Sequence, residues 1–136
     1  MTTLLEPQSD FMTTIHAEMA RQMTDSRDSI AQSGDIAVDI AEAIRRTGRL
    51  ILLGMGGSHA VGRALEPSYR ALGIEAVALP LSEQLDSPLP LDGWTAIVTS
   101  QSGESAEVLR WFSEGHAPKD AFGLSMEGAS SLAGIV

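Results

Sequence analysis

Four short apolar segments, separated by stretches of helical length, most strongly constrain the fold of this 136-residue chain. Each has the length of a buried strand and lacks the polar alternation of a half-exposed one. The four segments are residues 50–53, 76–79, 96–99 and 121–124. Their starts lie about 20 to 26 residues apart, which fits strand–helix–strand units with right-handed crossovers. The pattern therefore predicts an α/β fold, a three-layer sandwich with a central parallel sheet.

The remaining segments predict the helices and the division of the chain. We expect an N-terminal helical segment over residues 1–47 and the α/β domain over residues 48–136. The N-terminal segment contains one helix from about residue 9 to 33, with an apolar residue at every fourth position, and a second one that ends before Gly48. We also expect helices over residues 58–72, 82–85 and 104–114, the first broken at Pro67. A last helix starts near residue 128 with no strand after it, which suggests an incomplete sheet and a longer natural protein.

Charge and composition exclude several kinds of function. The formal net charge is −9, from 18 acidic and 9 basic side chains, so we expect no nucleic acid and no anionic membrane as partner. The chain has no cysteine, no secretory signal and no apolar run long enough to cross a bilayer. We therefore expect a cytoplasmic protein without metal or cofactor. The same charge repels phosphate at long range, so a phosphate site here must work through short-range geometry.

A glycine-rich turn, GMGGS at 54–58, follows the first predicted strand and precedes a helix. Glycines allow positive φ and let a ligand approach the peptide groups, and the free N–H groups of a helix N-terminus favour an anion. The turn lacks the Lys and Ser/Thr of a P-loop. The alternative is a tight structural turn with Ser58 as an ordinary N-cap.

A second polar turn, TSQSGES at 99–105, follows the third predicted strand. Its hydroxyls can rotate to donate, and with the amides of the next helix they can surround a phosphate without any cation. The alternative is a capping arrangement, with Ser102 or Gly103 at the N-cap and Glu104 in the first helical turn. Both turns lie at the carboxyl ends of parallel strands, where open α/β sheets bind ligands. We therefore predict a phosphate site formed by the two turns.

The second turn resembles the phosphate-binding motif of the sugar isomerase (SIS) domain family. The resemblance covers roughly residues 10–135, including residues 82–83 after the second strand. Over this range the chain is similar to the first SIS domain of the isomerase half of glucosamine-6-phosphate synthase and of related sugar-amine deglycases. That synthase has threonines where this chain has Ser105 and Gly57. The resemblance implies that the phosphosugar is bound by Gly56, Gly57, Ser58, Ser100, Gln101, Ser102, Ser105 and Ser130.

Enzymes of this family carry two SIS domains and move a proton between C1 and C2 of an open-chain phosphosugar. By resemblance, the chain is the N-terminal half of an aldose–ketose isomerase, an aminotransferase-like enzyme or a deglycase. The apolar, Met-lined face of the N-terminal helix predicts a homodimer. The catalytic Glu and a C-terminal Lys lie in the second domain or its tail, so no catalytic residue is assigned here. His59 is more simply a residue of the first helical turn than a proton shuttle. The alternatives are a non-catalytic module that senses a sugar phosphate and a domain that serves only in assembly.

Overall fold

The computed structural model describes the backbone of residues 6–136 and the side chains of residues 11–136. The chain divides into two compact units, Met1–Asp39 and Ile40–Val136. The described part of the first unit contains helix α1 (Glu6–Gln32) and the beginning of helix α2 (Gly34–Thr47). The second unit contains the end of α2 and the whole α/β domain. No helix in the described part of the chain has an apolar stretch long enough to cross a bilayer.

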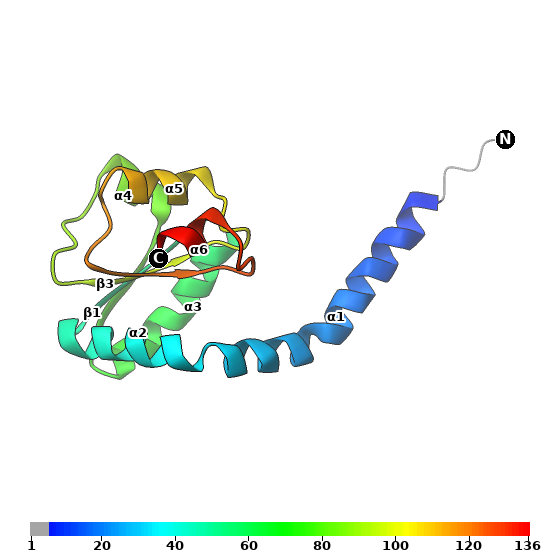
Figure 1. Cartoon of the computed structure of the whole chain (residues 1–136), viewed down its shortest axis with the longest axis horizontal. Helices are drawn as coiled ribbons and strands as arrows, with labels where there is room; N and C mark the ends of the chain where they lie inside the picture. The colour runs from blue at the N-terminus through cyan, green and yellow to red at the C-terminus, as the bar shows by residue number, and fades with distance from the viewer. Residues whose placement is uncertain (1–5) are drawn as a thin grey trace. The chain divides into compact units, whose positions relative to one another are not determined.

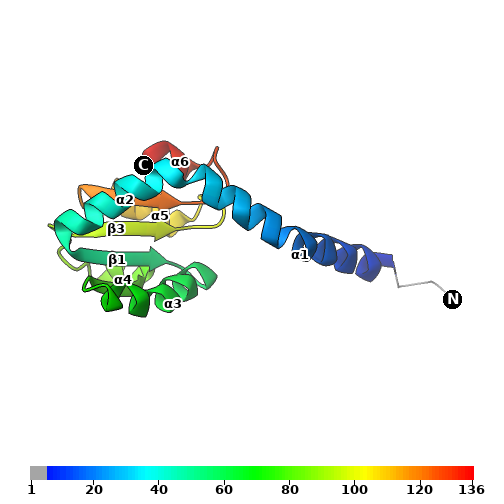
Figure 2. The same ribbon diagram turned by 90° about the horizontal axis from the view of Figure 1, so that it is seen from below.

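The α/β domain is built on four parallel strands, as predicted. They are β1 (Arg49–Gly54), β2 (Glu75–Pro80), β3 (Thr95–Thr99) and β4 (Asp120–Leu124), in the spatial order β2-β1-β3-β4. Figure 2 shows β1 and β3 side by side and pointing the same way. Strands β1 and β3 are almost fully buried. The prediction of burial is wrong for β4, which is half-buried because it forms one edge of the sheet.

Helices cover both faces of the sheet and make the predicted three-layer sandwich. These helices are the end of α2, α3 (Gly57–Ala71), α4 (Leu81–Asp86), α5 (Ala106–Ser113) and α6 (Ser131–Ile135). Alternate residues of β1 point to opposite faces. Leu50 and Leu52 pack with Ile44 of α2, whereas Ile51 and Leu53 belong to the core that contains residues of α4, α5 and α6. In Figure 1, α4 and α5 accordingly lie on one side of the strands and α3 on the other.

Helix α3 continues through Pro67, so the predicted break is wrong. Pro67 removes one helical N–H donor, but a buried contact beside it holds the helix against the sheet. Glu66 is only 3% exposed, and its carboxylate accepts the N–H of Ala78 in β2 at 2.9 Å. The same carboxylate pairs with Arg63 and Arg70. This tertiary contact offsets the local effect of the proline.

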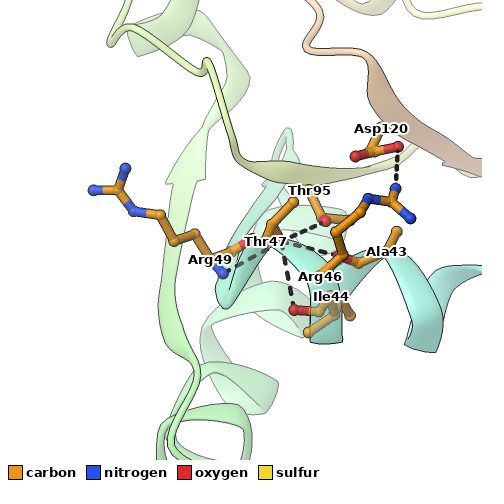
Figure 3. Close-up of polar contacts among 7 residues, drawn as sticks. All are labelled: Ala43, Ile44, Arg46, Thr47, Arg49, Thr95 and Asp120. Atoms are coloured by element: carbon orange, nitrogen blue, oxygen red, sulfur yellow. Dashed lines mark hydrogen bonds and ion pairs between the residues drawn. The ribbon is translucent and has the colours of Figure 1, made fainter.

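A polar cluster fastens the end of α2 to the edge where the strands begin (Figure 3). Gly48, at φ 66°, ends the helix as predicted, and its N–H donates to the carbonyl of Ile44 at 2.8 Å. The hydroxyl of Thr47 lies 3.1 Å from the carbonyl of Ala43 and 2.9 Å from the hydroxyl of Thr95, which is fully buried in β3. The two predicted turns lie at the opposite edge, where the strands end.

We predict that Thr47→Val and Thr95→Val each lower the free energy of unfolding by about 1 kcal/mol, because each removes one side of a partly buried hydrogen bond. Since the two hydroxyls contact each other, the double variant should lose less than the sum of the single variants. Urea denaturation of the four proteins measures this coupling. Simple additivity would contradict the contact.

Candidate phosphate-binding site

The first turn joins β1 to α3 through a close contact that requires glycine. A Cβ on Gly54 would lie 2.8 Å from the backbone carbonyl carbon of Ser58 and 2.9 Å from the backbone nitrogen of His59. Gly56 precedes the helix at φ 53°. Its carbonyl accepts the N–H of Ala60 at 3.1 Å. Gly56 is therefore the N-cap, and the alternative in which Ser58 caps the helix is wrong.

The first turn of α3 presents several groups that can bind an anion. In the described part of the chain, the N–H groups of Gly57 and His59 have no hydrogen-bond partner, as is usual at the start of a helix. The half-buried Ser58 has no partner for its hydroxyl among the described residues. Unpaired amides at a helix N-terminus attract an anion. Ser58 thus lies in the first turn of α3, beside these amides.

The imidazole of His59 has one buried nitrogen. Its Nδ1 has no hydrogen-bond partner among the described residues. The ring itself is half-buried in the first turn of α3. This placement fits the simpler of the two interpretations, in which His59 is a residue of the helix, and no described contact brings it to the second turn.

The second turn is shaped around Gly103, which is buried and has φ 66°. The hydroxyl of Ser100, buried at the end of β3, accepts the N–H of Gly103 at 3.1 Å. The hydroxyl of Ser102 accepts the N–H of Glu104 at 3.2 Å. Gln101 and Ser102 are exposed. The turn therefore presents Gln101 and Ser102 to solvent, while Ser100 holds the backbone in place.

Helix α5 starts two residues later than predicted, at Ala106, and its N-cap is Ser105. The expectation that Ser102 or Gly103 caps the helix is therefore wrong, because the turn around Gly103 occupies those residues. The hydroxyl of Ser105 accepts no hydrogen bond from the described helix backbone; it donates instead to the carboxylate of Glu107 at 2.9 Å. The backbone N–H of Glu107, together with this contact, keeps the pKa of Glu107 below its usual range.

Ser130 lies directly against the second turn. A Cβ on Gly103 would come within 2.2 Å of the Ser130 hydroxyl oxygen. The carbonyl of Gly103 accepts the N–H of Leu132 at 3.0 Å. Ser130 itself is the N-cap of α6 and accepts the N–H of Ala133 at 3.3 Å. Ser130 therefore lies beside the second turn, and its hydroxyl caps α6.

Glu104 is fixed by α6 and is not free to meet a ligand. Its carboxylate accepts the N–H of Ser131 at 2.6 Å and the hydroxyl of the same residue at 2.7 Å. The backbone N–H of Ser131, followed by its hydroxyl, lowers the pKa of Glu104. Sequence reasoning missed this link, which joins residues 27 positions apart. The only sequence signal was the short Gly- and Ser-rich stretch before α6.

The sheet brings the two turns to one edge. Gly54 and Thr99, the last residues of β1 and β3, are neighbours in the strand register. Within the described residues no hydrogen bond joins Ser58 to residues 100–105. Two surface hollows, of about 410 and 380 Å³, are lined by other residues, the first by α4 and the second near Gly48 and Gly73. The candidate site is thus a shared edge with two polar turns.

No family model matches the sequence, and no curated protein matches it. Solved structures do match. The protein c3406 of E. coli CFT073, in complex with arabinose 5-phosphate, has a TM-score of 0.71 and 20% identity; the match covers 94% of this chain and 70% of that one. A phosphosugar isomerase of Bacteroides fragilis, assigned to capsule formation, has a TM-score of 0.65, 22% identity and coverages of 85% and 69%.

A further structural match is longer than this chain. The tagatose-6-phosphate ketose/aldose isomerase of Escherichia coli has a TM-score of 0.61 and 20% identity, and the match covers 77% of this chain but 31% of that protein. These likenesses show the fold. The chain has the α/β fold of solved phosphosugar isomerases, the fold that the resemblance to the SIS family implied.

Two glycines of the first turn give a matched test of the close contact there. We predict that Gly54→Ala lowers the free energy of unfolding by about 3 kcal/mol, because its methyl group meets backbone atoms that cannot move aside. Gly57→Ala should change it by less than about 1 kcal/mol, since no described atom beyond its chain neighbours and the backbone of its own helix lies within 4 Å of the new methyl. Urea denaturation compares the two. Equal losses would contradict this geometry.

Glu104 should make stability depend on pH. Its pKa is lowered in the folded state, so its contribution is present at neutral pH and is lost as the pH falls through the folded pKa. We predict that Glu104→Gln destabilises the protein at pH 7, and that the difference from the wild type shrinks at about pH 3. Denaturant unfolding at both pH values measures this. Glu83→Gln, in α4 and with no described bond to its side chain, is the control.

Proposed function

We propose that this chain is an SIS domain that binds a phosphosugar, with the phosphate at residues 100–105. The observation that supports it most is the register of Gly54 with Thr99, which places two polar turns on adjacent strand ends. Ligands of open α/β sheets bind at this edge. One match, c3406, was solved with a phosphosugar, arabinose 5-phosphate, bound to it.

The second turn has the chemistry to hold a dianion. The exposed Gln101 and Ser102 carry donors on flexible side chains, and the amides that open α5 add further donors. Ser58 and the free amides of Gly57 and His59 contribute from the neighbouring turn. Gly56 permits their approach to a ligand. Ser100, by contrast, acts mainly by holding Gly103, and Ser130 by holding α6.

The carboxylates nearest to this turn accept hydrogen bonds from neutral donors and keep their negative charge. Glu104 is bound by Ser131, and Glu107 by its own N–H and the hydroxyl of Ser105. These hydrogen bonds hold the two carboxylates toward their own donors. A phosphate at the turn must therefore be bound by short-range hydrogen bonds, against the repulsion of the net charge of −9.

We propose further that the domain belongs to an enzyme that moves a proton between C1 and C2 of its phosphosugar, as an isomerase, an aminotransferase-like enzyme or a deglycase. The phosphate would hold the open-chain sugar in place for that step. The match spans only about a third of the tagatose-6-phosphate isomerase. We therefore expect the catalytic acid and base of the proposed reaction to lie outside the 136 residues of this chain. We also propose a homodimer, which the exposed Phe11, Met19 and Met23 of α1 support.

Thermal unfolding with paired ligands tests the phosphate site. We predict that arabinose 5-phosphate and glucosamine 6-phosphate raise the melting temperature clearly more than arabinose and glucosamine do. At about 100 times Kd the gain corresponds to about 2.7 kcal/mol. The double variant Gln101→Ala/Ser102→Ala should lose this difference and keep the melting temperature of the free protein, because both side chains are exposed.

Ser68→Ala, an exposed change in α3, is the control and should respond as the wild type does. An equal response to a phosphosugar and its parent sugar would remove the phosphate assignment. A double variant that still responds fully would place the phosphate elsewhere.

A further inference from the structure

Gln84 of α4 is the most unusual polar side chain of the domain. It is only 1% exposed, yet neither its Nε2 nor its Oε1 has a hydrogen-bond partner among the described residues. Buried amides are almost always paired, and an unpaired one destabilises the fold. Its Nε2 carries two N–H donors and its Oε1 two lone pairs, so the amide requires partners that accept and donate.

Gln84 also lines the hollow of about 410 Å³ beside α4, a volume within the range of small-molecule sites. The hydroxyls of Ser82 and Ser87 and the carboxylates of Glu83 and Asp86 surround it. In the described part of the chain none of these four side chains has a hydrogen bond. Asp86 interacts electrostatically with Arg110, but the guanidinium of Arg110 is already bound to the carboxylate of Glu114 at 2.6 Å.

The hollow lies at the same edge of the sheet as the two turns. Strand β2 ends at Pro80, the register neighbour of Gly54, and α4 follows immediately. Both amide atoms of Gln84 are buried, so the side chain must change its rotamer at χ1 or χ2 to bring them into the hollow that it lines. Rotation about the terminal torsion alone only exchanges the two atoms.

These groups together select a ligand. Two carboxylates without hydrogen bonds repel a phosphate and accept the hydroxyls of a sugar. A hydroxyl can also accept from Nε2 and donate to Oε1 of Gln84, whereas an ammonium group leaves the Nε2 donor unpaired. Leu89, 47% exposed, offers an apolar surface to the C–H groups. We propose that the hollow beside α4 binds a neutral polyol, an unphosphorylated sugar, with Gln84 as its central hydrogen-bonding residue.

Titration of the full chain with D-glucose, followed by two-dimensional ¹H–¹⁵N NMR, tests this site. We expect the side-chain amide signals of Gln84 and the backbone signals of α4 to shift. Gln84→Leu should weaken the response about tenfold or more without lowering the melting temperature, because it replaces an unpaired buried amide by an apolar group. Asp86→Ala, at an exposed position, should weaken it while leaving the fold intact.

The outcomes distinguish this proposal from its alternatives. Shifts at α4 with the cation agmatine but not with glucose would overturn it. A clear loss of stability in Gln84→Leu would also overturn it, because it would show that the amide has a hydrogen-bond partner in the free protein. One such partner would be the Nε1 of buried Trp111, which has no described partner. The variant Gln101→Ala/Ser102→Ala should bind glucose normally, so failure of the phosphate site would leave this result unchanged.

Discussion

The close contact between Gly103 and the residues before α6 is the constraint on which the second turn depends. Gly103 has no side chain, so Ser130 can lie against it, and the Gly103 carbonyl receives the N–H of Leu132. Leu132 is fully buried in the core that also contains residues of α4 and α5. The core thus anchors α6, α6 anchors the turn, and the turn presents Gln101 and Ser102. A side chain at Gly103 would break this sequence of contacts at its first step.

The same contacts bear on the electrostatics of the proposed phosphate site in a chain of net charge −9. Such a molecule does not attract a phosphate from a distance, so the proposed site depends on local donors. The structure places Glu104 on the N-terminus of α6 and Glu107 on its own amide, which leaves the side of Gln101 and Ser102 without a free carboxylate among the described contacts. The carboxylates of α4 differ from these, because Glu83 and Asp86 have no described hydrogen bond. One edge of the sheet therefore offers two chemically distinct environments.

Much of this arrangement could be predicted from the sequence, because its signals are local. Runs of four apolar residues have the length of buried strands, their spacing requires crossovers, and glycine- and serine-rich turns follow the strands directly. The parallel sheet, the three layers and the common edge of the two turns follow from those signals. The resemblance of residues 100–105 to a phosphate-binding motif added the class of ligand, and solved phosphosugar isomerases share the fold.

What only the tertiary structure decided depends on contacts between distant residues. Helix α3 passes through Pro67 because Glu66 is bound by β2, and α5 starts at Ala106 because Gly103 and Glu104 are held by α6. Strand β4 is half-buried because it is an edge, although residues 121–124 are as apolar as a buried strand. The unpaired amide of Gln84 gives no signal in the sequence at all, since pairing is a property of neighbours. The sequence alone determined where strands and turns occur; packing determined which polar groups remain available for a ligand.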